Sequence, residues 1–273
     1  MAIPWDFEPS VLIGCSALLG LYVWGVSRLA REDWWRLKVA CCVAGDAALA
    51  LALISPLDTL ADHYFFSAHM AQHLLLLEFV APLLLLSLPA SLPLPGLIGR
   101  VERQLRRPMT AWAIGFGTLA VWHVPACYNA AVAHAALHVF EHLCFLVSAS
   151  IFWWPVLAPR RASRMPASSS ILYLFSRMAA NLALGTAIFA APVGLYAGYG
   201  AAAAGLGWGL TPLVDQRLGG LLMWVPTLLI DICAAPLLLV LFLSPSEERH
   251  GPMSPAGTDR GASAAPGGWA GSR

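Results

Sequence analysis

Residues 65–88 read FFSAHMAQHLLLLEFVAPLLLLSL, a stretch made up mostly of apolar side chains. At a rise of about 1.5 Å per residue, a helix of this length can cross a bilayer core of about 30 Å. Its only acidic or basic side chain besides the histidines is Glu78, and the histidines themselves, His69 and His73, are four residues apart. The stretch therefore predicts a membrane-spanning helix that carries a pair of imidazoles on one face, near its beginning.

The composition of the whole chain is that of an integral membrane protein. Of its 273 residues, 59% are hydrophobic and 11% are charged, whereas soluble domains have about 45–50% and 25%. The net charge of +1 leaves no basic surface for nucleic acid. We expect an all-α bundle in residues 1–245 with seven membrane spans: Ser10–Ser27, Lys38–Ile54, Phe65–Leu88, Met109–Val124, Ala130–Leu157, Ser170–Ala191 and Leu218–Leu243. Residues 246–273 are rich in Ser, Pro, Gly and Ala, which predicts a disordered cytoplasmic tail.

The distribution of Lys and Arg predicts the orientation of the spans, because positive residues stay on the cytoplasmic side. Every second loop between the expected spans is basic, and the loops in between carry only Arg217. The basic residues of the first set of loops and of the tail are Arg28, Arg31, Arg36, Lys38, Arg100, Arg103, Arg106, Arg107, Arg160, Arg161, Arg164, Arg249, Arg260 and Arg273. We therefore expect a multi-pass protein of the cell (inner) membrane with its N-terminus outside and its C-terminus in the cytoplasm.

Most of the histidines gather at one level of this expected topology, in the outer half of the membrane: His63, His69, His73, His123, His134, His138 and His142. His134, His138 and His142 are spaced by four residues, so they are expected to form a stripe on one helix face. Polar side chains within a bilayer are costly, and function is their usual explanation. A hydrogen-bonded structural role is the alternative for any single histidine, but the gathering of so many favours a metal site.

The residue types around these histidines indicate which metal to expect. Imidazole suits copper, zinc and haem iron, and thioether sulfur favours copper(I) among these. Met70 and Met223 are expected at the same level, as further ligands or as ordinary apolar packing. Asp215, Gln216 and Glu141 are expected to hydrogen-bond a ligand histidine and to hold its ring in place. Copper is therefore the expected ion, with zinc or haem as the alternatives.

A second polar layer is expected near the middle of the membrane, and it consists of Asp46, Glu78, Arg177 and Asp231. Glu78 is about 180° from His69 around an ideal helix, so this layer is expected to face a different interface from the histidines. One interpretation is structural pairing, with Arg177 neutralised by Asp231 or Asp46. The other is a path for protons or ions.

Short motifs follow one another along the expected spans: Ser67–His73 (SAHMAQH), Ala81–Leu83 (APL), Trp122–Tyr128 (WHVPACY), His138–His142 (HVFEH), Phe152–Pro155 (FWWP) and Asp215–Trp224 (DQRLGGLLMW). In their order and spacing, from about Ala52 to Leu243, the chain resembles the CtaG family of polytopic membrane cytochrome c oxidase assembly factors. The resemblance implies an inner-membrane protein that helps a haem-copper oxidase mature, by helping copper reach its buried centre. The partners that it implies are the oxidase subunits and, as a further candidate, another copper chaperone.

Three classes of function are left open by the residues. No nucleophile elbow, phosphate loop or catalytic triad is recognisable, so we expect no enzyme. A copper-handling assembly factor is the leading hypothesis. A haem-binding membrane cytochrome would use two histidines on facing spans, such as His73 and His142, as axial ligands. A metal transporter should also have ligands at the inner face, and the sequence has none there.

Overall fold

The computed structural model describes residues 3–28, 35–91, 96–192, 194–196, 199, 201–204 and 206–243, and all regular elements in them are helical. The tail expected at 246–273 lies outside the described residues. The first seven elements are α1 (Pro9–Ser27), α2 (Trp35–Ile54), α3 (Pro56–His63), α4 (Phe66–Leu75), the π-helical turn η1 (Leu76–Val80), α5 (Ala81–Ser87) and α6 (Gly96–Leu105). The others are α7 (Pro108–Trp122), α8 (Pro125–Ala133), α9 (Ala135–Leu157), the 3₁₀ turn η2 (Arg161–Ser163), α10 (Ala167–Ala190), α11 (Ala201–Ala204) and α12 (Pro212–Leu243).

Six helices of the described chain are long and apolar enough to cross a membrane: Pro9–Ser27, Trp35–Ile54, Phe66–Ser87, Ala135–Leu157, Ala167–Ala190 and Pro212–Cys233. The span expected at Met109–Val124 corresponds to α7, which has 15 residues. A helix of that length covers about 22 Å, less than the bilayer core of about 30 Å. Length and composition therefore support a multi-pass membrane protein with six candidate spans, and the seventh span stays a prediction.

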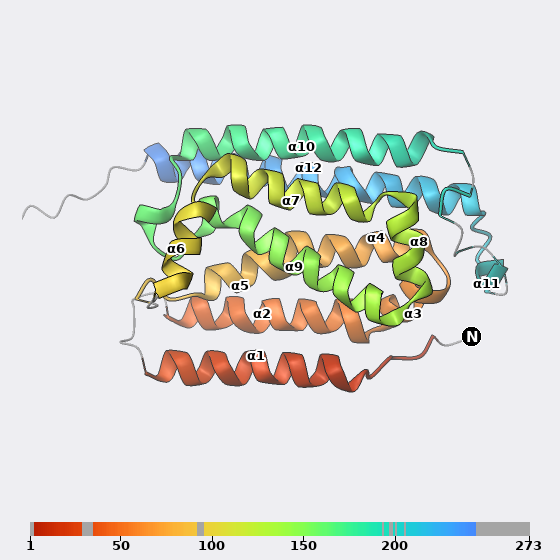
Figure 1. Cartoon of the computed structure of the whole chain (residues 1–273), viewed down its shortest axis with the longest axis horizontal. Coiled ribbons are helices and arrows are strands. Elements are labelled where there is room, and N and C mark those ends of the chain that lie inside the picture. Colours follow the sequence, from red (N-terminus) through yellow and green to blue (C-terminus); the bar gives the residue numbers. More distant parts are fainter. Residues whose placement is uncertain are drawn as a thin grey trace, which may run out of the picture. The chain divides into compact units, whose positions relative to one another are not determined.

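The long helices lie side by side in one bundle, with α1 at one edge next to α2 (Figure 1). At the other edge α10 packs against α12, which also contacts α4, and α7 packs against α9. Half of the helix Phe66–Ser87 is buried inside the bundle. The stretch that opens with His69 and His73 is thus the central helix of the fold. The short helices α3 and α8 lie at one end of the bundle and α6 lies at the other (Figure 1).

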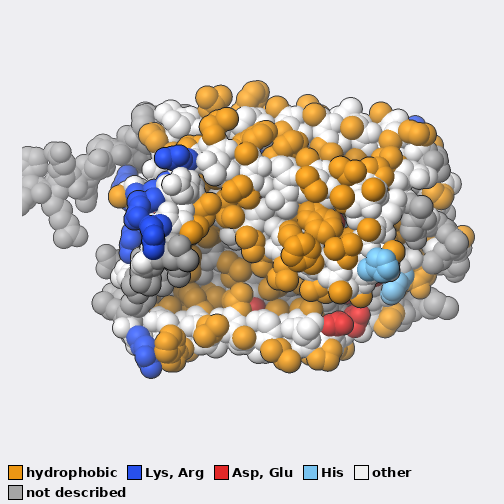
Figure 2. Space-filling view, in the orientation of Figure 1, with side chains coloured by type: hydrophobic (Ala, Val, Ile, Leu, Met, Phe, Trp, Pro, Cys, Tyr) orange, Lys and Arg blue, Asp and Glu red, His pale blue; other side chains and the backbone are white. Residues whose placement is uncertain are grey.

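The surface of the bundle is apolar along its length and basic at one end. Large side chains such as Leu21, Val147 and Leu172 are more than half exposed, at 67%, 58% and 69%, as expected for side chains that face lipid. Figure 2 shows Lys and Arg side chains gathered at the end where α6 lies, and His side chains toward the opposite end. The basic and histidine-rich loops therefore lie at opposite ends of the bundle, and the side of the membrane that each end faces stays a prediction.

The central helix changes its hydrogen-bonding pattern at η1, just before Pro82. A proline has no N–H, and its ring collides with the carbonyl four residues earlier, which belongs to Glu78. The wider π-helical turn accommodates that collision but leaves backbone groups without their usual partners. The indole Nε1 of Trp153 donates a hydrogen bond of 3.0 Å to the carbonyl of Leu77. Trp153 therefore ties α9 to the central helix at its irregular turn.

Arg177 of α10 is the centre of a buried ion-pair group. Its Nη1 lies 2.6 Å from Oε1 of Glu78, and its Nη2 pairs with Asp231 of α12. Three of the four residues expected in the polar layer, Glu78, Arg177 and Asp231, therefore lie together. Asp46 lies apart from them, because the α2 face that carries it is turned toward the Cys15 thiol of α1. The pairing of Arg177 with Glu78 was not predicted from the sequence.

The helix expected to run from Ala130 is broken at His134. α8 ends at Ala133, His134 has extended backbone angles (φ −136°, ψ 107°), and α9 begins at Ala135. A residue outside the helix does not follow its periodicity, so the predicted stripe of three histidines is wrong. Only His138 and His142 remain on a shared face of α9.

Candidate metal centre

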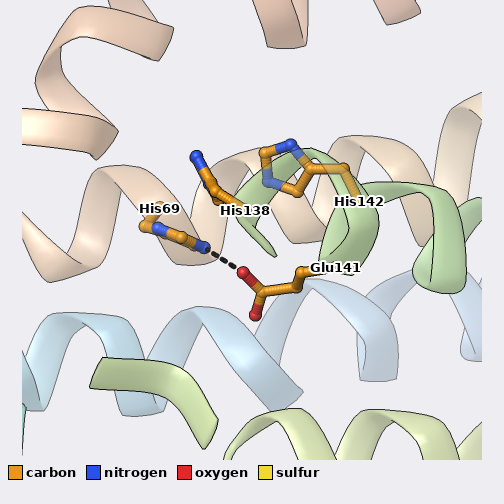
Figure 3. A group of neighbouring side chains, drawn as sticks. All are labelled: His69, His138, Glu141 and His142. Atoms are coloured by element: carbon orange, nitrogen blue, oxygen red, sulfur yellow. Dashed lines mark ion pairs between the residues drawn. The ribbon is translucent and has the colours of Figure 1, made fainter. Parts of the chain in front are cut away.

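The first turn of α4 and the first two turns of α9 bring four metal-ligating side chains together. His69 comes from α4, and His138, Glu141 and His142 come from α9 (Figure 3). One ligand atom from each of the four lies within 4.8 Å of those from the others. A tetrahedral ion with bonds of about 2.0–2.1 Å needs ligand atoms about 3.4 Å apart, so these donors would have to close by at most about 1.4 Å. We call these four residues the His/Glu cluster.

The donor atoms of the His/Glu cluster have no hydrogen-bond partners in the described part of the chain. Nε2 of each of its three histidines and both carboxylate oxygens of Glu141 are buried and unpartnered. Nε2 of His69 lies 3.6 Å from Oε2 of Glu141, the pair marked in Figure 3. A buried polar group without a partner costs about 1–3 kcal/mol. Three imidazoles and one carboxylate would all be satisfied by a divalent cation, so the cluster fits a metal ion.

Tyr199 determines which nitrogen of His69 faces the cluster. Its hydroxyl lies 3.1 Å from Nδ1 of His69, 2.8 Å from the hydroxyl of Tyr128, and 3.0 Å from the carbonyl oxygen of Ala61. Burial raises the pKa of Tyr199 far above its usual range, so the phenol keeps its proton. A carbonyl oxygen only accepts, so Tyr199 donates to Ala61 and accepts from His69. The His69 proton is then on Nδ1, and Nε2 presents its lone pair to Glu141.

Asp62 of α3 lies beside His138 in an ion-pair contact rather than a hydrogen bond. Its Oδ1 lies 3.4 Å from Nδ1 of His138, whose Nε2 is buried and unpartnered. A carboxylate beside one nitrogen of an imidazole fixes the ring and makes the other nitrogen a better ligand. In two of the three histidines, His69 and His138, Nδ1 therefore contacts a polar group. Nε2 of both rings has no hydrogen-bond partner among the described residues.

A buried hydrogen bond anchors α3 against the central helix. Nε2 of Gln72 donates to Oδ1 of Asp58 at 2.6 Å and to the carbonyl of Ala52 at 2.8 Å. Burial, and then the negative charge of Asp62, raise the pKa of Asp58 to about 7. Asp58 and Asp62 are one helical turn apart, so this anchor also positions the carboxylate that contacts His138.

His73, His123 and Met70 lie next to the His/Glu cluster but outside it. Nε2 of His73 is 3.8 Å from Oε1 of Glu141. Nε2 of His123 is 3.3 Å from Sδ of Met70. All three side chains are buried, at exposures of 0%, 4% and 0%. The ring of His73 also lies against those of His69 and His142, at centroid distances of 4.3 and 5.7 Å, so His73 borders the His/Glu cluster on one side and His123 on the other.

Three other predicted ligands lie elsewhere. His63 and His134 are exposed, because one ends α3 and the other stands at the break before α9. Met223 is buried in an apolar cluster with Phe66 and Ile188. The structure therefore gives none of these three a place in the His/Glu cluster.

Asp215 and Gln216 bind backbone groups, and no described hydrogen bond joins either of them to a histidine. The carboxylate of Asp215 accepts the backbone N–H groups of Phe66 and Ser67 at 2.7 and 3.0 Å, which caps the N-terminus of α4. Gln216 donates to the carbonyls of Ile188 and Ala191, at the end of α10. Their described hydrogen bonds therefore go to backbone groups, and Asp215 anchors the turn that carries His69.

Sequence reasoning missed three features of the cluster. Glu141 was expected only to support a histidine, and its carboxylate instead lies among the ligand atoms. Its spacing of three residues from His138 was the available signal, since such residues share a helix face. Asp62 and Tyr199 were not predicted as neighbours of the histidines, because they come from a short helix and a connecting segment without helical periodicity.

Fold and site together define a class: a polytopic helical membrane protein with a buried cluster of three histidines and a glutamate that could hold a metal ion. Residues 20–244 match the family described as cytochrome c oxidase caa3 assembly factor (Caa3_CtaG). The match covers most of the chain, and the protein belongs to this family. No solved structure matches the chain.

Three mycobacterial relatives, all described as uncharacterized proteins, share 26% identity with the chain. The match to the protein of Mycobacterium leprae (strain TN) covers 82% of this chain and 37% of the relative. The matches to the proteins of Mycobacterium bovis and Mycobacterium tuberculosis each cover 81% of this chain and 36% of the relative. The chain therefore spans little more than a third of the length of these curated relatives.

Proposed function

We propose that this protein is a membrane assembly factor for a haem-copper cytochrome c oxidase, and that it holds copper in the His/Glu cluster and assists its delivery to the oxidase. One observation carries the proposal: His69, His138, Glu141 and His142 each bring one ligand atom within 4.8 Å of the others, and Nε2 of each histidine and both Glu141 oxygens are buried without a hydrogen-bond partner among the described residues. Family membership supports the connection to oxidase assembly. The partners in this proposal are the oxidase subunits, together with a further copper chaperone that would supply the ion.

Copper is the ion that the donors and the family favour together. Imidazole binds copper well, and copper exceeds zinc in affinity for a given nitrogen and oxygen site. His69, His138 and His142 would supply neutral nitrogen ligands, and Glu141 would supply one negative charge. When bound, copper would be the cargo of the site, and no catalytic step is proposed. Tyr199 and Asp62 would keep two rings oriented while the ion enters and leaves.

The location of the cluster suits an exchange with the outer side of the inner membrane. His69 lies in the first turn of α4, and His138 lies in the first turn of α9. Both helices would enter from outside if the chain has seven spans, that is, if α7 crosses the membrane in addition to the six candidate spans. The basic residues gather at the opposite end (Figure 2), which would then face the cytoplasm.

The proposal is tested in cells that lack the chromosomal copy of the gene. Wild-type protein should restore oxidase activity and the copper content of the purified oxidase, whereas a His138→Ala, His142→Ala variant should restore neither, with haem content unchanged. His134→Ala is the matched control, because it removes an exposed histidine just before α9. Full copper content in oxidase from the double variant would overturn the proposal. A visible haem spectrum in the purified protein itself would favour a cytochrome instead.

A further inference from the structure

We propose that His73, His123 and Met70 form a second metal site, specific for a soft monovalent cation such as copper(I), beside the His/Glu cluster. The observation that points to it is the contact of 3.3 Å between Nε2 of His123 and Sδ of Met70. The inference extends the proposed copper-handling function, on which its biological meaning rests. Its donor atoms are a separate set, so the two proposals can fail independently.

The hydrogen bond of Nδ1 on the other side of the His123 ring determines whether Nε2 carries a proton. Nδ1 lies 2.8 Å from the carbonyl oxygen of Leu119, which can only accept, so Nδ1 carries the proton. In the neutral ring the lone pair is then on Nε2, and it points at the lone pairs of the Met70 sulfur. Two acceptors without a proton between them do not attract each other. A cation bound to both would make this contact favourable.

The ring nitrogens of His73 provide a second observation, independent of the contact between His123 and Met70. Its side chain is fully buried, and neither Nδ1 nor Nε2 has a hydrogen-bond partner among the described residues. It follows Met70 by three residues on α4, so both side chains lie on one face of that helix. The ring centroid of His73 is 5.5 Å from that of His123. A third donor is therefore available beside the nitrogen and sulfur pair.

The geometry of the nitrogen and sulfur pair suits a common ion. With bonds of about 2.0 Å to nitrogen and about 2.3 Å to sulfur, a separation of 3.3 Å gives an angle of about 100° at the ion, close to tetrahedral. The bond lengths are those of ordinary imidazole and sulfur ligands.

The donor set selects the charge and softness of the ion. Two neutral imidazoles and one thioether bring no negative charge, and thioether sulfur prefers copper(I) to divalent ions. The carboxylate nearest to His73 is Glu141, at 3.8 Å, and it belongs to the His/Glu cluster. A divalent ion is therefore expected in the His/Glu cluster, and a monovalent ion is expected in the second site.

The sulfur ligand makes the second site directly testable. Purified full-length protein in detergent is loaded anaerobically with copper(I), treated with a copper(I) chelator to remove loosely held ions, and examined by X-ray absorption. We expect a sulfur shell at about 2.3 Å. Met70→Leu, which conserves volume, should remove that shell and leave one copper(I) fewer per chain. Met223→Leu is the matched control, because Met223 is buried in the same apolar cluster as Met70 but no described contact joins its sulfur to a histidine, and it should change neither.

The other outcomes separate this inference from the proposed function. Copper(I) without a sulfur shell in the wild type, or a shell that survives Met70→Leu, would overturn the second site. Loss of the shell in Met223→Leu would overturn it as well. Zinc(II) loading of the His/Glu cluster is measured in the same samples, and Met70→Leu should leave it intact. A His138→Ala variant should lose zinc(II) and keep the sulfur shell, so failure of the first site does not resemble failure of the second.

Discussion

The Tyr199 hydroxyl lies 3.1 Å from Nδ1 of His69, and this contact turns the other nitrogen of the ring toward the Glu141 carboxylate. Tyr199 comes from the segment between α10 and α12, whereas His69 is on α4 and Glu141 is on α9. The position of the ligand lone pair on His69 therefore depends on a part of the chain that contributes no ligand. This makes Tyr199 the first residue to test.

Replacing Tyr199 with Phe removes the hydroxyl that accepts from His69 and leaves the ring. Loss of such a supporting hydrogen bond costs about 10–100-fold in metal affinity, and we expect a decrease in that range, measured by competition with a metal-binding dye. Tyr173→Phe is the control, because its hydroxyl donates to the carbonyl of Phe152 at 2.9 Å, away from the cluster. Equal affinities in wild type and Tyr199→Phe would show that this contact does not orient a ligand.

Replacing Arg177 with Leu leaves the carboxylates of Glu78 and Asp231 buried without their cation. Breaking a buried ion pair costs about 3–5 kcal/mol, so the Tm in detergent should fall markedly. Adding Glu78→Gln and Asp231→Asn should recover part of the loss, because the charges are then removed together. Adding Asp46→Asn to Arg177→Leu should recover nothing. Recovery with Asp46→Asn would contradict the assignment of Glu78 and Asp231 as the partners.

The stability of the metal-free protein should fall as the pH rises through the range in which Asp58 titrates. Its pKa is raised from its usual 3.8 to about 7 by burial and by Asp62. Between these values the folded protein binds this proton more tightly than the unfolded chain does. Stability therefore declines with rising pH up to about 7 and is constant above it. Tm measured at pH 5 and pH 8 should differ less in Asp58→Asn than in wild type. Equal differences in the two proteins would refute this assignment.

The seventh span is tested by alkaline phosphatase fusions on either side of α7, since the enzyme is active only outside the cytoplasm. A fusion after Arg107 should be inactive and one after Val124 should be active, if α7 crosses the membrane. A fusion within 206–211 should also be active. Identical activity after Arg107 and Val124 would mean that α7 does not cross and that the chain has six spans.

Much of the site could be predicted from periodicity alone. His138 and His142 are four residues apart on α9, and a four-residue spacing keeps side chains on one face of a helix. The loop charges placed the beginnings of both histidine helices at the same level, and the structure does bring His69 together with His138 and His142. The helical fold and the six candidate membrane spans followed from apolar length in the same way.

The remainder depends on breaks in that periodicity and on contacts distant in sequence. The break at His134 follows α8, whose Tyr128 is fully buried and has its ring centroid 6.4 Å from that of Tyr199, a residue distant in sequence. The π-helical turn before Pro82 accompanies the pairing of Glu78 with Arg177, a residue 99 positions away. Contacts of that kind have no periodic signal in the sequence.

The claim that the His/Glu cluster binds a metal ion is tested most directly by loading the purified full-length protein with copper(II). The copper content per chain is then measured by elemental mass spectrometry. The parent protein for this test carries Met70→Leu, which removes the second site, and it should retain one ion per chain. Glu141→Gln, and separately His138→Ala with His142→Ala, should lose that ion, while His63→Ala and His134→Ala should keep it. An unchanged ion in the His138→Ala, His142→Ala variant, or no bound ion in the parent protein, would contradict the claim that the His/Glu cluster is a metal site.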